Sequence, residues 1–147
     1  MTFTEFKEQQ DARNTIQLNI RKYALMLCDA LKQNYIQRSI KSHERSLFRD
    51  FHQTSVDYHE ACIEALKNGE SDYDFFIEEG RKYLKIVMDA RGSKSVHAFV
   101  DKKTGDVFKP ASFKAPAKIA RYNVLMIESR EEMFERADWA GGYLYLR

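Results

Sequence analysis

All six glycines and both prolines of this 147-residue chain lie after residue 68. Glycine and proline most disfavour the interior of a helix, so the first 68 residues can form helix without interruption. Apolar residues recur there in steps of three and four, at Ile16, Ile20, Tyr23, Leu27 and Leu31. This spacing is typical of one face of an amphipathic helix. The sequence therefore predicts that the N-terminal half of the chain is helical.

We expect two helices in this half. The first carries the stripe just described and begins as early as Thr4. The second covers residues 42–67, and Asn68-Gly69 supplies a left-handed cap at its end. A short link at residues 34–41 would fold the two helices into an antiparallel hairpin. The apolar stripe of the second helix consists of Phe48, Phe51, Tyr58, Cys62 and Leu66.

From residue 73 the apolar pattern changes to a period of two, which indicates strands. We expect strands at residues 83–88, 96–100 and 107–109, joined by turns at 90–93 and 101–106 into a three-stranded antiparallel meander. Gly105 is expected in the left-handed conformation that closes the second turn with a bulge. The third strand ends at Pro110, which cannot donate a hydrogen bond to a neighbouring strand.

The C-terminal third adds three short elements. Pro116 suits the first turn of a helix over residues 115–122. Ser129 and Glu132 fit a capping box that opens a second helix, ending near Ala137. Alternation at residues 143–146 predicts an edge strand. The predicted fold class is α+β, a helical hairpin packed on a small antiparallel sheet of meander plus edge strand. We expect one domain, residues 1–147, with a helical half (1–69) and a β-rich half (70–147).

The formal net charge of +2 conceals a strong segregation of charge along the chain. Residues 81–121, the basic block, hold 11 Lys and Arg but only 3 Asp and Glu, whereas the rest of the chain holds 13 basic and 19 acidic residues. Segregation of this kind favours a polyanionic or acidic partner. Aromatic residues are interleaved with these cations, and strands that present aromatic rings among cations bind single-stranded nucleic acid.

The sequence therefore predicts a DNA- or RNA-binding surface on the strands of the basic block. In this reading the cations contact phosphates, and the rings of Phe99 and Phe113 stack on bases. Two alternatives stay open: the aromatic residues are core and the acidic helices neutralise the cations, or the surface contacts a protein, including a second copy of the chain. The candidate cations are Lys82, Lys85, Arg91, Lys94, Lys102, Lys103, Lys109, Lys114, Lys118 and Arg121.

Catalytic and metal-binding patterns are weak in this sequence. His97 and Asp101 share a strand face but stand about 13 Å apart in an extended chain, too far for direct pairing. His52 and His59 are two helical turns apart, roughly 10 Å, so one ion cannot bind both without a third element. Neither Cys28 nor Cys62 has a neighbouring cation that would activate it, and we expect reduced thiols. We predict a non-enzyme with no metal site and no cofactor.

No apolar run approaches the roughly 18 residues that span a bilayer. The polar N-terminus also lacks the apolar segment of a secretory signal. These observations predict no contact with a membrane and a cytoplasmic location.

Three segments of the β-rich half carry a resemblance to known sequences. They read GRKYLKI (80–86), SVHAFVDKKTGDVFKPASFKAPAK (95–118) and ARYNVL (120–125). About a third of the chain thereby resembles a block found in small uncharacterised proteins of tailed bacteriophages. The resemblance implies a viral accessory protein in the cytoplasm of an infected host, with a host protein as an alternative partner, and it implies no activity. The polar residues of these segments that are first candidates for a site are His97, Asp101, Lys109 and Ser112.

Overall fold

The computed structural model describes residues 1–49 and 52–145 and is α+β, as the sequence predicts. Two helices, α1 (Phe3–Arg49) and α2 (Gln53–Lys67), precede five strands: β1 (Tyr73–Glu79), β2 (Tyr83–Ala90), β3 (Ser93–Asp101), β4 (Asp106–Pro110) and β5 (Pro116–Asn123). A third helix, α3 (Ile127–Arg136), and the 3-10 turn η1 (Gly142–Leu144) follow. None of the helices in these ranges is long and apolar enough to cross a membrane.

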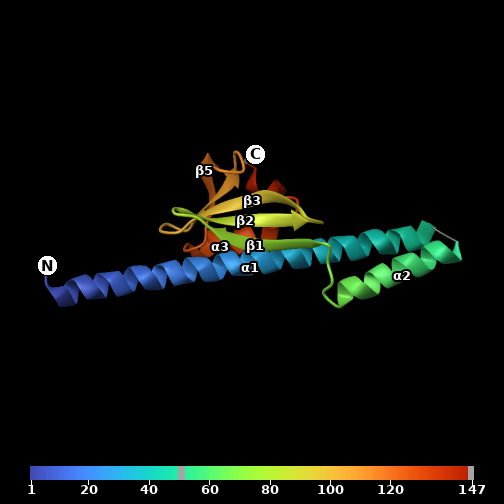
Figure 1. Cartoon of the computed structure of the whole chain (residues 1–147), viewed down its shortest axis with the longest axis horizontal. Coiled ribbons are helices and arrows are strands. Elements are labelled where there is room, and N and C mark those ends of the chain that lie inside the picture. The colour runs from blue at the N-terminus through green and yellow to red at the C-terminus, as the bar shows by residue number, and fades with distance from the viewer. Residues whose placement is uncertain (50–51, 146–147) are drawn as a thin grey trace.

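The predicted link at residues 34–41 is wrong, because α1 continues through it to Arg49. Polar side chains in this stretch bind the rest of the protein instead of ending the helix. Asn34 accepts a hydrogen bond from the backbone N–H of Trp139, and the Tyr35 hydroxyl donates one to Asp72. Residues 42–49 therefore belong to α1, and α2 lies beside the C-terminal part of α1 (Figure 1). Phe51 of the predicted stripe lies outside the described residues.

The predicted cap at the end of α2 is confirmed. Gly69 adopts a φ of +85°, which is costly for residues with a side chain. Its N–H donates to the carbonyl of Leu66, and the N–H of Glu70 donates to that of Ala65. These paired bonds satisfy the last carbonyls of the helix in a Schellman motif and turn the chain toward the sheet.

The sheet is larger than predicted, with five antiparallel strands in the order β1-β2-β3-β4-β5. The expected meander is confirmed as β2, β3 and β4, and Gly105 has the predicted left-handed conformation, with φ +78°. The helix predicted at residues 115–122 is wrong, because this segment is β5. Pairing of Tyr122 with Val107 and of Pro116 with Pro110 places Pro116 at the start of an edge strand, where its missing N–H costs little.

The C-terminal segment also departs from prediction. Helix α3 begins at Ile127, and the predicted capping box is absent because the Ser129 hydroxyl accepts a hydrogen bond from the N–H of Asn123. The expected edge strand is wrong for residues 143–145, where η1 forms instead. Leu146 lies outside the described residues. The edge strands of the sheet are β1 and β5, and the described C-terminal residues add no further strand.

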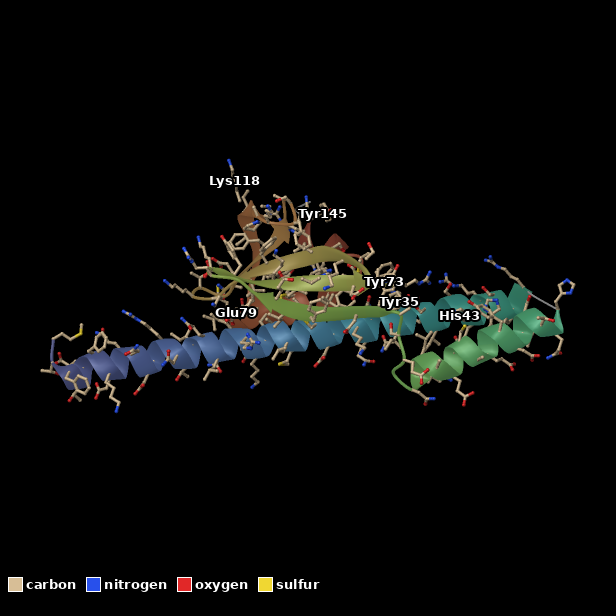
Figure 2. All side chains as sticks on the ribbon, in the orientation of Figure 1. Tyr35, His43, Tyr73, Glu79, Lys118 and Tyr145 are labelled. Atoms are coloured by element: carbon tan, nitrogen blue, oxygen red, sulfur yellow. The ribbon has the colours of Figure 1, made fainter. Side chains whose placement is uncertain are left out.

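The core lies between one face of the sheet and the middle of α1. Ile20, Ala24, Leu27 and Leu31 of α1 are fully buried, and Met133 of α3 and Leu144 of η1 close the same core. At the far end of this contact Tyr35 stacks on Tyr73 of β1 with ring centres 4.2 Å apart (Figure 2). The first 19 residues are all exposed, and this part of α1 projects beyond the sheet (Figure 1).

Candidate nucleic-acid interface

Alternation along β2 gives the sheet two different faces. Leu84 and Ile86 point into the core against α1, so Tyr83 and Lys85 point to the opposite face. A set of lysines and aromatic rings gathers on that face, from β1, β2, β3 and the turn between β4 and β5. We refer to it as the lysine–aromatic face, which comprises Phe76, Tyr83, Lys85, Lys94 and Phe113, together with Lys82, which reaches the Tyr83 ring from just before β2 at the end of the sheet.

Each lysine of this face lies over a ring. Lys85 Nζ is 4.3 Å from the centre of the Phe113 ring and 5.8 Å from that of Phe99. Lys82 Nζ lies 5.3 Å from the Tyr83 ring, and Lys94 Nζ lies 5.6 Å from the Phe76 ring. These distances are those of cation–π contacts. In the described ranges no carboxylate lies within ion-pair distance of these three lysines.

The two predicted stacking residues differ in access. Phe113 is 49% exposed at the turn after β4, so its ring is open to a ligand. Phe99 is 1% exposed, because the rings of Tyr83 and Phe108 and the stem of Lys85 cover it. Phe99 is therefore a core residue of this face, and stacking on a base is left to Phe113 and the half-buried Tyr83 and Phe76.

Three of the predicted cations have partners within the protein. Arg91 forms an ion pair with Asp72, which raises the pKa of Arg91 and lowers that of Asp72. Arg121 donates to the carbonyl of Leu144 at 2.6 Å. Lys102 donates to the carbonyl of Gly80 at 3.1 Å and lies 3.7 Å from Glu79.

The remaining candidate cations are scattered over the sheet. Lys103 and Lys114 lie exposed in turns, and Lys118 projects from β5 far from α1 (Figure 2). Lys109 Nζ lies 4.2 Å from the ring of Tyr145, beside η1. Of the predicted cations, only Lys82, Lys85 and Lys94 therefore belong to the lysine–aromatic face. The other predicted cations lie elsewhere on the sheet or its turns.

A second basic cluster lies at the end of the sheet that is nearest the exposed first part of α1. Two cavities of about 290 and 490 Å³ adjoin there, and both are lined by Gln17 and Lys102. The only acidic residues lining them are Glu79, which accepts from Arg21 at 2.9 Å, and Asp101. We call this the sheet-end notch; its cations are Arg21, Arg81, Lys82, Lys102 and Lys103.

The four polar residues singled out in segments 80–86, 95–118 and 120–125 do not form one site. His97 and Lys109 both line a cavity of about 260 Å³. Asp101 instead accepts hydrogen bonds from the N–H groups of Lys103 and Thr104 in its own turn. Ser112 does the same for Lys114 and Ala115. Asp101 and Ser112 therefore stabilise turns, apart from that cavity.

His97 is a buried, neutral histidine. Its Nε2 lies 2.8 Å from the Tyr143 hydroxyl, and its ring meets that of Phe75 edge to face. Burial lowers the pKa of His97 to about 4, which the nearby carboxylate of Asp138 only partly opposes. Burial likewise raises the pKa of the Cys28 thiol to about 12, so this thiol is not a nucleophile at neutral pH.

Sequence reasoning missed several residues of these surfaces. Phe76 belongs to β1, a strand that was not predicted, and Arg21 lies outside the basic block of residues 81–121. The pairing of His43 with His59, whose Nδ1 atoms are 2.8 Å apart, depends on how α2 folds back on α1. The alternation of Tyr73, Phe75 and Ile77 was the one signal that could have revealed β1.

Comparison with known proteins identifies a family. No curated protein and no solved structure is detectably similar to the chain. One family model, described as a family of unknown function (DUF7717), matches residues 3–146. The match includes the projecting part of α1 as well as the sheet. The chain therefore belongs to the family of unknown function DUF7717.

Proposed function

We propose that this chain is a non-enzymatic protein that binds single-stranded nucleic acid across its lysine–aromatic face. One observation carries the proposal: Lys82, Lys85 and Lys94, three lysines without a carboxylate partner in the described residues, each lie beside a ring of the lysine–aromatic face. Single strands are bound by this combination, since phosphates need cations and exposed bases need rings to stack on.

The dimensions of the face fit a short single strand. Lys82 precedes β2, and Lys94 pairs with Asp89 near its other end. The strand rises about 3.3 Å per residue, so this distance is about 20 Å, enough for roughly 4 nucleotides at the lower limit of known site sizes. Phe113, with an exposed ring over Lys85 in the middle of the face, is the best placed to stack on a base.

Carboxylates near the lysine–aromatic face weaken its long-range electrostatic attraction for nucleic acid. Glu78 lies opposite Lys85 in the register of β1 and β2, and Asp89 lies opposite Lys94. These carboxylates reduce the net charge of the face, so we expect modest affinity. Three phosphate contacts on a single strand correspond to a salt slope of about −2, a loss of about 20-fold in affinity between 50 and 200 mM salt.

Fluorescence anisotropy with labelled single-stranded DNA, duplex DNA and RNA tests the proposal. The variant K82Q/K85Q/K94Q should lose most of the binding and flatten the salt slope. The variant K22Q/K41Q/K67Q removes the same charge from exposed helix positions and should bind like the unmodified protein. Absence of binding to all three nucleic acids at low salt, or equal losses in both variants, would refute the proposal.

A second measurement isolates stacking from charge. Stacking contributes about 1–3 kcal/mol per base, so Phe113→Ala should weaken single-strand binding by about 5- to 150-fold. Its salt slope should stay unchanged because no cation is removed. The resemblance to phage proteins supports a viral accessory role for this activity, and binding of an acidic host protein by the same lysines is the alternative that a negative anisotropy result would favour.

A further inference from the structure

Within the described residues, the first part of α1 buries no side chain, and only its last residues, such as Gln17, lie beside the sheet. Residues 1–19 are all exposed, although Phe3, Phe6, Ile16 and Leu18 are among them. The segment extends a helix that is already formed, so only propagation and side-chain contacts hold it in the helical conformation. Its Thr and Asn residues are weak helix formers and make propagation less favourable. A helix of this kind normally gains its stability by packing its apolar face on a partner.

The exposed face of this free segment, residues 3–19, continues the face that the sheet covers. At about 100° per residue, Phe6, Gln9, Arg13 and Ile16 lie within about 40° of the direction of Ile20, the first residue that the sheet buries. Two apolar side chains, Phe6 and Ile16, therefore continue the buried direction past the end of the sheet, with Gln9 and Arg13 between them, and none of the described residues covers them. Thr2 and Glu5 fix the start of the helix through a reciprocal capping box, with N–H to oxygen distances of 3.0 and 3.1 Å.

We propose that the free segments of two copies pair antiparallel, so that the chain is a homodimer through the first half of α1. A two-fold axis at the level of Asp11 places Phe6 of one copy against Ile16 of the second, and Gln9 against Arg13. Both contacts occur twice, as a two-fold interface requires. The proposal does not rest on nucleic-acid binding, because Phe6 and Ile16 lie outside the lysine–aromatic face, and only Lys82 belongs both to that face and to the notch.

The length of the free segment supports this register. The same axis brings Thr2, the cap of one helix, level with Ile20 of the second copy, where the sheet begins to cover α1. Each free segment therefore covers the exposed face of the free segment in the other copy. The partner helix ends at the level where the sheet begins to cover α1. The helical surface left uncovered in the single chain (Figure 1) is covered by the partner helix in the dimer.

Charge complementarity indicates that a second copy of the chain covers the free segment. It also favours the antiparallel over the parallel orientation of the two helices. The free segment is acidic at its start, with Glu5, Glu8 and Asp11 against Lys7 and Arg13. Antiparallel pairing brings this start to the cation-rich sheet-end notch of the other copy. Parallel pairing would place Arg13 against Arg13 and leave both notches without the acidic segment.

Sedimentation equilibrium over a dilution series tests the dimer. The full chain should sediment as a dimer, and F6E/I16E should be monomeric, because it buries a carboxylate at both apolar contacts. The matched control is L25E/M26E. These two residues are 47% and 44% exposed, close to the 50% and 41% of Phe6 and Ile16, but they lie at least about 120° around α1 from the direction of Ile20. The control should remain dimeric.

A cross-linking experiment tests the orientation. On a Cys62→Ser background, a mixture of F6C and I16C chains should form mainly the mixed disulfide under oxidation. Preferential F6C–F6C links would indicate parallel pairing and overturn the proposal. A monomer at every concentration, a dimer that survives F6E/I16E, or a dimer that L25E/M26E also dissolves would overturn it as well. Because Phe6 and Ile16 are exposed and line neither cavity of the notch, F6E/I16E should leave the fold of the sheet intact.

Discussion

The buried histidine gives the protein a predictable sensitivity to acid. His97 is 8% exposed and held between Phe75 and Tyr143, and burial lowers its pKa from 6.5 to about 4. The folded state therefore holds this ring neutral, while the unfolded chain protonates it below pH 6.5. His97 contributes its full stability above that pH, and the contribution falls as the pH drops toward 4.

The size of the effect follows from the shift. Each pKa unit corresponds to about 1.4 kcal/mol, so protonation of the unfolded chain should remove about 2 kcal/mol of unfolding free energy by pH 5 and about 3 kcal/mol by pH 4. Urea denaturation at pH 7, 6 and 5 measures this loss. His97→Gln removes the titration but retains a group that can bond the Tyr143 hydroxyl. The variant should therefore lose about 2 kcal/mol less than the unmodified protein between pH 7 and 5.

This comparison separates His97 from every other titrating group. Carboxylates and the other histidines titrate in both proteins and cancel in the difference. The comparison does not depend on how stable the variant is at pH 7, because only the change in unfolding free energy between pH 7 and pH 5 is compared. Equal losses in the two proteins, within about 0.5 kcal/mol, would show that His97 is protonated in the fold and would refute the reasoning.

Three further predictions concern the fold. Leu27→Ala, at a fully buried contact of α1 with the sheet, should cost about 2–5 kcal/mol in urea unfolding, whereas exposed Leu25→Ala should change stability by less than about 0.5 kcal/mol. Gly105→Ala should lower the melting temperature more than Gly92→Ala: both have positive φ, but only at Gly105 would a Cβ meet side chains, at 3.1 Å. Burial and the neighbouring His59 lower the pKa of His43, so the α1–α2 contact should weaken below pH about 6.5; faster amide exchange in α2 at acid pH would show this, and unchanged exchange would contradict it.

The sequence correctly predicted those elements whose conformation depends mainly on residues close together in the chain. The helical first half follows from the absence of glycine and proline, and the end of α2 follows from Gly69, which takes the left-handed conformation at little cost. The meander of β2, β3 and β4 follows from period-two alternation and the turn at Gly105. In each case the preference of a few adjacent residues agrees with the tertiary structure.

The candidate interface was predicted only in part, because exposure is not a local property. Lys85 and Lys94 do share a face, which alternation along neighbouring strands can suggest, whereas Lys82 precedes β2 and reaches the Tyr83 ring from the end of the sheet. Arg91 was expected to be free, yet it pairs with Asp72, a residue 19 positions away that lies next to it only after β1 joins the sheet. Cations in a sequence predict charge, and only the fold shows which of them have partners.

The division of the chain into a helical and a β-rich half, and the left-handed positions of Gly69 and Gly105, follow from the amino-acid sequence alone. The places where pairing overrides local preference depend on contacts between distant residues. Residues 116–123 carry a helix-start signal but become β5, because β4 offers an open edge whose N–H and C=O groups need partners. Residues 34–41 continue as helix because their polar side chains bind Trp139 and Asp72 across the core. Such contacts join residues far apart in the chain, and a local sequence pattern holds no information about them.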